Sequence, residues 1–231
     1  MARKNWTFSP SLMCMSFLQI AHDVEILNRH FQSLHVDISD GHFCKSILLS
    51  PNYVKDIKQI TTLPIEVHLM VENPNDYIDD LVDAGANTII VHVESINRDA
   101  FRTINRIRSR GVKVGIALCP ETPLSYIMPL LRYVDIVSIL NVDIGFAGQP
   151  LIAEMLDRTK MLAEIKKHRQ YNFVIQSDGG VTDSTYHALT TAGTECFVLG
   201  NNALFSKSHD LEDACRTMKS NFNREIGGMT K

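Results

Sequence analysis

The sequence predicts a single (β/α)8 barrel, also called a TIM barrel, that spans residues 1–231 as one α/β domain. Short apolar, β-branched runs alternate eight times with amphipathic stretches of helical period. No proline-rich or glycine-serine linker interrupts the alternation. Connections of this length between successive strands favour parallel pairing with the helices outside the sheet. Eight such units in one chain of this size predict closure into a barrel.

The predicted strands are short runs bounded by polar turn residues. In chain order they are Thr7–Leu12, Leu34–Ile38, Ile65–Met70, Thr88–His92, Lys113–Leu118, Ile136–Leu140, Phe173–Asp178 and Cys196–Leu199. The predicted helices between them are Phe17–Arg29, Pro51–Gln59, Pro74–Ala84, Ala100–Arg110, Leu124–Arg132, Ile152–His168, Asp183–Thr191 and Leu211–Phe222. A doubly wound open sheet is the alternative. Its first strand-to-helix turn usually carries glycines, and the turn after Ser9 has none.

Composition narrows the class of partner. The 231 residues are 45% hydrophobic, enough for one large core, and the net charge of −3 leaves no electrostatic footprint for nucleic acid. The stretch Met1–Thr7 is polar and no apolar run of 18 residues occurs, so we expect no membrane association and a cytoplasmic location. The five cysteines are odd in number and widely spaced, which argues against a disulfide framework. A small-molecule partner is the expectation that remains.

Ionisable residues end four of the predicted strands, at the edge where barrels carry function. They are His35 and Asp37, His68, His92 with Glu94, and Asp178. His35 and Asp37 alternate along one strand, so they share a face with Cα atoms roughly 6–7 Å apart. Any one of these residues is also typical of a hydrogen-bonded core or capping position. Inward-facing ionisable groups on several strands need a partner, and a divalent metal ion would supply it.

Glycine-bearing loops follow the last three predicted strands. They are Asp143–Pro150, Asp178–Gly180 and Gly200–Asn202. Glycines let backbone N–H groups approach an anion closely, and barrels commonly bind phosphate at this position. A single loop of this kind is typical of an ordinary tight turn. Three of them on adjacent strands favour a phosphate-binding cradle.

Six segments in this order resemble the ribulose-phosphate 3-epimerase family over almost the whole chain. They are Ser9-Pro10-Ser11, His35-Val36-Asp37, Asp40-Gly41-His42-Phe43, His68-Leu69-Met70-Val71, Gly145-Phe146-Ala147-Gly148-Gln149 and Asp178-Gly179-Gly180. The resemblance implies a ribulose-phosphate-binding barrel and an isomerase that inverts C3 of a ketose phosphate. Within the family, the chain is most similar to the epimerases that interconvert D-allulose 6-phosphate and D-fructose 6-phosphate. The segments that carry this finer likeness are Ser11–Met15, Leu49–Pro51, Pro120–Pro123, Gly148–Pro150 and Glu154–Asp157. Interconversion of ribulose 5-phosphate and xylulose 5-phosphate is the alternative.

The resemblance also implies a cofactor, roles for residues and an assembly. It implies one divalent cation per subunit, zinc, iron, manganese, cobalt or magnesium, with His35, Asp37, His68 and Asp178 as ligands. Asp37 and Asp178 would exchange the C3 proton through an enediolate. The substrate-contact positions would be Ser11, His68, Gly145, Phe146, Ala147, Gly148, Asp178, Gly179, Gly180, Gly200, Asn201 and Asn202. We expect a small-molecule ketose phosphate as the partner, and a homo-oligomer.

The chain departs from the family pattern around the expected pocket. Ser39 and Leu140 stand where methionines are usual, which predicts a shorter, more polar cover beside Met70 and room for a hexulose. Further departures are Ile144 for a proline, Cys44-Lys45 for Val-Pro and Gln176-Ser177 for Glu-Val. His92 and Glu94 are expected to line the rim and order polar neighbours.

Two other functions fit a phosphate-binding barrel. Decarboxylation of a sugar acid would be expected to place a lysine near the reacting carbon, and the predicted strand ends carry none. A non-catalytic sugar-phosphate sensor is supported only by the altered Ser39 and Leu140. Because the expected acids and ligands are intact, the sequence favours the epimerase.

Overall fold

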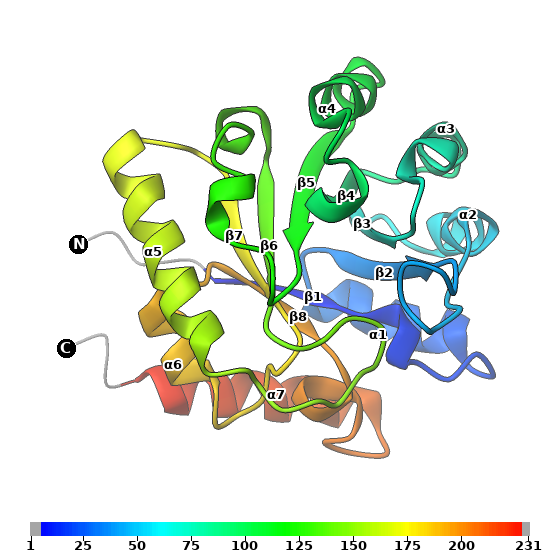
Figure 1. Cartoon of the computed structure of the whole chain (residues 1–231). Coiled ribbons are helices and arrows are strands. Elements are labelled where there is room, and N and C mark those ends of the chain that lie inside the picture. Colours follow the sequence, from blue (N-terminus) through cyan, green and yellow to red (C-terminus); the bar gives the residue numbers. More distant parts are fainter. Residues whose placement is uncertain (1–5, 228–231) are drawn as a thin grey trace.

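A computed structural model describes residues 6–227, which form a ring of eight parallel strands with the helices outside it (Figure 1). The strand order is β1-β8-β7-β6-β5-β4-β3-β2. A parallel bridge between Ser11 and His35 joins β1 to β2 and closes the ring. The predicted fold class is therefore confirmed. Residues 1–5 and 228–231 lie outside the described residues, and so do the expectations that concern them.

The strands follow the prediction to within two residues at each end. They are β1 Thr7–Pro10, β2 Leu34–Ser39, β3 Ile65–Met70, β4 Thr88–His92, β5 Lys113–Leu118, β6 Ile136–Leu140, β7 Val174–Asp178 and β8 Cys196–Leu199. The first strand ends early because the chain turns into a 3-10 helix over Leu12–Cys14. That turn carries the backbone across the mouth of the barrel.

Within residues 6–227, seven α-helices surround the strands. They are α1 Ile20–His30, α2 Pro51–Ile60, α3 Ile78–Asp83, α4 Ala100–Ser109, α5 Glu154–Arg169, α6 Tyr186–Ala192 and α7 Leu211–Ile226. Short 3-10 helices cover Leu12–Cys14, Pro74–Asp76, Val93–Ser95, Leu124–Tyr126 and Leu131–Tyr133, and a π-helix covers Asn201–Phe205. Across residues 6–227, no helix is long and apolar enough to cross a membrane.

The predicted helix Leu124–Arg132 is wrong. The chain forms two separate 3-10 helices there, Leu124–Tyr126 and Leu131–Tyr133. Pro129 stands in the middle of the predicted range. Proline has no N–H to donate and disfavours helical backbone at the residue before it, so a continuous α-helix is interrupted. The buried Leu124 and Leu131 keep the segment packed against the sheet nonetheless.

Alternation along the strands separates two environments. In β2, Leu34, Val36 and Ile38 belong to the large core between sheet and helices, while His35 and Asp37 face the barrel interior. The interior holds one small apolar cluster, made by Ile90, Ala117, Ile136 and Leu140. It also holds buried polar side chains from other strands, among them Glu66, His68, His92 and Gln176. Because buried polar groups require partners, these residues locate the candidate site.

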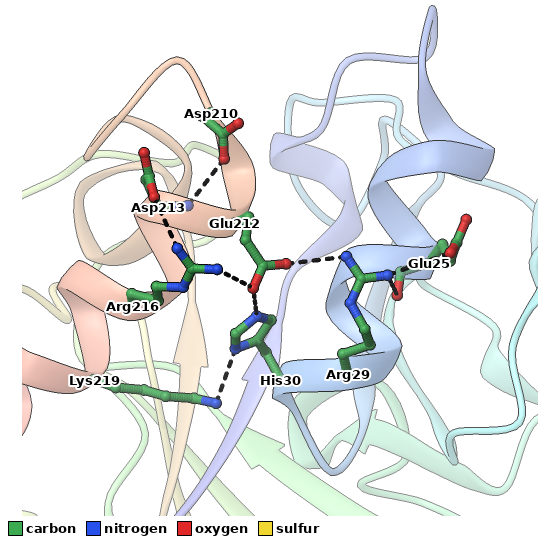
Figure 2. Close-up of polar contacts among 8 residues, drawn as sticks. All are labelled: Glu25, Arg29, His30, Asp210, Glu212, Asp213, Arg216 and Lys219. Atoms are coloured by element: carbon green, nitrogen blue, oxygen red, sulfur yellow. Dashed lines mark hydrogen bonds and ion pairs between the residues drawn. The ribbon is translucent and has the colours of Figure 1, made fainter.

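The first and last helices meet where the barrel closes (Figures 1 and 2). Glu212 of α7 accepts hydrogen bonds from Arg29 and His30 of α1, at 3.0 and 2.7 Å, and from Arg216 at 3.2 Å. Lys219 donates to Nδ1 of His30 at 3.1 Å, so the Nε2–H of His30 is the group that reaches Glu212. We call these five residues the α1–α7 ion network.

Candidate active site

Four side chains converge inside the barrel at the C-terminal ends of three strands. β2 supplies His35 and Asp37, β3 supplies His68 and β7 supplies Asp178, with ligand atoms that all lie within 4.8 Å of one another. Nδ1 of His68 is 3.2 Å from Oδ1 of Asp37 and 3.4 Å from Oδ2 of Asp178. Nε2 of His35 is 3.3 and 3.8 Å from the same two oxygens. Two imidazole nitrogens and two carboxylate oxygens thus face one point.

This donor set fits a divalent cation. Both ring nitrogens of His35 are fully buried without a hydrogen-bond partner, which is costly unless another group satisfies them. A mixed shell of two nitrogens and two oxygens suits zinc, iron, manganese or cobalt and tolerates magnesium. The register of the sheet explains the convergence, because Asp37 and His68 are paired residues of neighbouring strands. The four residues named by the resemblance are therefore those that could hold a metal ion.

The carboxylates and imidazoles of the cluster shift one another's pKa values. Burial on its own would raise the pKa of Asp37, but the facing imidazoles of His35 and His68 hold it well below its usual range. Burial would lower the pKa of His68, yet hydrogen bonds and charge from Asp178 and Asp37 raise it. The pKa of His35 is raised by the same carboxylates against the effect of its burial. The carboxylate oxygens of Asp37 and Asp178 face the same imidazoles, so a cation placed between them is favoured.

A second set of side chains supports these four. Oε2 of Glu66 lies 3.7 Å from Nδ1 of His35 and accepts a 2.9 Å hydrogen bond from Gln176. Burial would raise the pKa of Glu66, but His35 and the hydrogen bonds around it lower it, so the group is a carboxylate. Ser11 donates to Oδ2 of Asp37 at 2.5 Å, which leaves Oδ1 toward the imidazoles. The sequence singled out Ser11 but missed Glu66, which in isolation resembles an ordinary strand-edge charge.

A cavity opens directly above the cluster, and its floor is formed by Asp37, His68 and Asp178. The structure places all twelve predicted substrate-contact residues around it: Ser11, His68, Gly145, Phe146, Ala147, Gly148, Asp178, Gly179, Gly180, Gly200, Asn201 and Asn202. Contact with a substrate stays a prediction. Across the described residues, the lining includes no lysine or arginine. An anion held here would therefore be bound by backbone N–H groups and polar side chains.

Backbone shape at the rim depends on glycine at two positions. Gly179 and Gly180 have φ of +80° and +63°, in the left-handed region. A Cβ on Gly179 would lie 2.3 Å from Cγ2 of Val142, so no larger residue fits. The neighbouring loop is tied by Gln149, whose side-chain amide donates to the carbonyl oxygens of Asp143 and Phe146 at 2.6 and 2.9 Å. These contacts hold two glycine loops against one cavity.

The cover of the cavity differs from the sequence expectation. Leu140 and Met70 line it, as do Met13, Cys14 and Leu48, which the site prediction did not include. Ser39 does not line the cavity. Its hydroxyl donates to the carbonyl oxygen of Ser46 at 2.7 Å, because residues 40–47 fold back over the end of β2. Of the two altered positions, Leu140 therefore lines the cavity and Ser39 does not.

Comparison with known proteins identifies the family. A sequence model described as the Ribulose-phosphate 3 epimerase family matches residues 7–205. The ribulose-phosphate 3-epimerase of Treponema pallidum is 37% identical over 204 residues, which cover 88% of this chain and 93% of the relative. The chain belongs to the ribulose-phosphate 3-epimerase family. The Bacillus subtilis ribulose-phosphate 3-epimerase is 32% identical over 202 residues, covering 87% and 92% of the two chains. The predicted enzyme class is confirmed: the protein is an epimerase, a carbohydrate isomerase.

Solved structures agree on the fold. A 3-hexulose-6-phosphate synthase superposes with a TM-score of 0.68 at 13% identity, covering 93% of this chain and 99% of its own. The N-(5'-phosphoribosyl)anthranilate isomerase of Pyrococcus furiosus gives a TM-score of 0.62 at 14% identity, covering 97% and 100%. At these identities the likeness concerns the barrel architecture alone.

Proposed function

We propose that this family member interconverts ribulose 5-phosphate and xylulose 5-phosphate, with one divalent cation held by His35, Asp37, His68 and Asp178. The observation that carries the proposal is the pair of acids in the cavity floor. Asp37 and Asp178 come from β2 and β7, which are not neighbours in the ring, so their carboxylates approach the floor from different sides. Epimerisation needs two such groups, because one base cannot reach both faces of the same carbon.

Each residue has a task in this chemistry. One aspartate removes the proton from C3, beside the C2 carbonyl, and the other returns a proton to the opposite face of the enediolate. Ser11 holds Oδ2 of Asp37 and so orients that carboxylate. A bound divalent cation supplies Lewis-acid stabilisation of negative charge on the substrate oxygens. The glycine loops hold the phosphate, which keeps C3 between the two acids.

The substrate assignment is supported by the named relatives, which are ribulose-phosphate 3-epimerases. A second candidate is the six-carbon pair D-allulose 6-phosphate and D-fructose 6-phosphate. It is favoured by the segment Ser11–Met15, which resembles hexulose-phosphate epimerases and whose Met13 and Cys14 line the cavity. Leu140, which stands where the family usually has a methionine, also changes the cavity wall that Met70 shares.

The test is a comparison of kcat/KM for ribulose 5-phosphate and allulose 6-phosphate on one metal-loaded preparation. We expect the pentulose to be preferred. The ratio should be modest, since one extra group in a pocket is worth about 1–3 kcal/mol. A preference for the hexulose assigns the second candidate. Absence of hydrogen exchange at C3 with either compound overturns the proposal.

A matched pair of variants shows which residue sets that ratio. Leu140→Met places a longer, unbranched side chain at the cavity wall and should shift the ratio further toward the pentulose. Ser39→Met changes a residue that does not line the cavity and should shift the ratio less. The cytoplasmic location and the homo-oligomer stay predictions of the sequence.

A further inference from the structure

A chain of hydrogen bonds runs from His68 away from the cavity, and the chemistry proposed above does not use it. We propose that His92 and Glu94 are positioning residues that fix the tautomer of His68 and present its Nδ1 lone pair to the metal. The inference rests on the proposed function, because it assumes the divalent cation.

The three side chains are in continuous contact, and the two histidines are buried. Nε2 of His68 lies 2.8 Å from Nε2 of His92, and Nδ1 of His92 lies 3.1 Å from Oε2 of Glu94. The two imidazole rings are stacked, with an interplanar angle of 23° and centroids 5.0 Å apart. His92 is completely buried, so water does not compete for its nitrogens. Besides Glu94, Nδ1 of His92 has one weak neighbour, Sγ of Cys119 at 3.6 Å.

Glu94 is fixed as the terminal acceptor of the chain. Its Oε1 accepts the backbone N–H of Cys119 at 2.9 Å and the hydroxyl of Thr122, which leaves Oε2 for His92. Burial would raise the pKa of Glu94, but the hydrogen bonds from His92 and Thr122 lower it to about 2. The group is an ionised carboxylate at neutral pH and can only accept hydrogen bonds.

Acceptance by Glu94 determines every proton on the path. Nδ1 of His92 must carry the hydrogen, so Nε2 of the neutral ring is an acceptor. Nε2 of His68 must then donate to it. In neutral His68 this leaves Nδ1 without a hydrogen, and Nδ1 is the atom that faces Asp37 and Asp178. A metal-ligating histidine commonly donates its other ring N–H in this way, which sets the ring orientation and increases the basicity of the ligand atom.

The same residues could instead be read as a second metal site, since ligand atoms of His92, Glu94 and Cys119 lie close together. The geometry favours the hydrogen-bonded chain. Both nitrogens of His92 already have partners in His68 and Glu94. Burial also raises the pKa of Cys119, so its sulfur is a thiol, whereas a metal binds the thiolate.

His35 also has a carboxylate behind its ring, but without an intervening histidine. Its Nδ1 faces the carboxylate of Glu66 directly, at 3.7 Å, whereas His68 reaches a carboxylate through His92. Each imidazole of the cluster thus has a carboxylate behind the nitrogen that points away from the cavity, Glu66 for His35 and Glu94, through His92, for His68. This parallel distinguishes a supporting role from an incidental contact at the rim.

The experiment measures zinc affinity and histidine tautomers in the intact chain. Zinc is titrated into metal-free wild type, Glu94→Gln and His92→Phe, with Ser138→Ala as the control. The control removes the buried hydroxyl of Ser138, which has no hydrogen-bond partner and does not belong to the hydrogen-bonded path from His68 to Glu94. We expect one zinc per wild-type chain, affinity weakened about 10–100-fold in both test variants, and little change in the control. Nitrogen-15 NMR of the zinc-loaded wild type should show hydrogen on Nε2 of His68 and on Nδ1 of His92.

The outcomes separate this inference from the metal centre on which it rests. Wild type that binds no zinc overturns the metal centre and the inference together. One tightly bound zinc with unchanged affinity in both test variants overturns only the role of His92 and Glu94. An NMR result that places hydrogen on Nδ1 of His68 also overturns the role of His92 and Glu94. This measurement uses wild type alone, so it remains decisive even where His92→Phe fails to fold. Two zinc ions, one of them lost in Cys119→Ala, would assign the second metal site instead.

Discussion

Asp37 and Asp178, the two acids proposed to exchange the C3 proton, lie in different environments. Asp37 is held by Ser11 and is 6% exposed, whereas the side chain of Asp178 is 15% exposed. If each serves one face of C3, Asp37→Asn and Asp178→Asn should each lower kcat by about 10²–10⁴-fold. The measurement is turnover of metal-loaded protein, with metal content determined on the same sample.

Solvent deuterium separates the two roles. A variant that keeps its metal and loses one acid should still exchange the C3 hydrogen of one epimer while failing to form the other. Near wild-type epimerisation in both metal-loaded variants contradicts the two-base mechanism.

The convergence of the four proposed ligands was predictable because it follows from strand periodicity and position. His35 and Asp37 lie two residues apart, so they must share the interior face, and the ends of parallel strands must meet at one rim. Ser39 has the same periodicity, yet its hydroxyl turns to the carbonyl of Ser46. That contact depends on how residues 40–47 fold back, which no local pattern in the sequence specifies.

At the level of elements, the α1–α7 ion network predicts a pH dependence of stability (Figure 2). Hydrogen bonds from His30 and Arg29 lower the pKa of Glu212 from its ordinary value near 4.5 to about 2. Because the folded state favours the ionised form, its contribution is complete above about pH 4.5 and is lost as the pH falls toward 2. Urea unfolding should show wild type more stable than Glu212→Gln at pH 7, with the difference shrinking as the pH falls.

The matched control for the network is Glu25→Gln. Glu25 also contacts Arg29, at 3.3 Å, but its side chain is 75% exposed. It should change stability less than Glu212→Gln at every pH. Because the network is partly exposed, added salt should also reduce the Glu212 effect. A difference that is independent of both pH and salt contradicts the electrostatic account.

The loop between β7 and α6 gives a second prediction at this scale, for Gly179→Ala. The new Cβ would combine a positive φ with a 2.3 Å approach to Val142, so the loop must move. We expect a loss in kcat/KM of about 10²-fold, typical of a misplaced substrate-binding loop. Steady-state kinetics and urea unfolding of the same preparation provide the check.

Gly111→Ala isolates the backbone cost in that experiment. Gly111 has a φ of +76° but no atom within 4 Å of a Cβ, so only strain is added there, about 1–2 kcal/mol. Its kinetics should match wild type. Equal destabilisation and unchanged kinetics in both variants would show that the contact with Val142 is unimportant.

For the whole molecule, the strands and their closure into a barrel were predicted, but the residues that make the closing contact were not. Apolar alternation reports local burial, and it located all eight strands to within two residues at each end. Closure depends on one bridge, between Ser11 and His35, which joins residues 24 positions apart. The wrongly predicted helix over Leu124–Arg132 shows that apolar spacing does not by itself specify an α-helix. The spacing there correctly indicated burial, but Pro129 interrupts the helical backbone.

Metal binding should stabilise the whole barrel, because the ligands come from strands on both sides of its closure. β2 and β3 lie on one side of the bridge, and β7 reaches it through β8 and β1. Free metal at one hundred times Kd adds about 2.7 kcal/mol if it binds only the folded chain. For a domain of this length that raises Tm by about 5–10 °C.

The check is calorimetry of metal-free protein with and without added zinc. His35→Ala/His68→Ala should lose the increase in Tm, since two of the four ligands are gone. His22→Ala, which removes an exposed histidine of α1 that does not belong to the cluster, should keep the increase in Tm. Full metal loading and an undiminished increase in the double variant would refute the ligand assignment. An increase in Tm that is lost in the double variant and kept in His22→Ala links the stability of the barrel to the four proposed ligands.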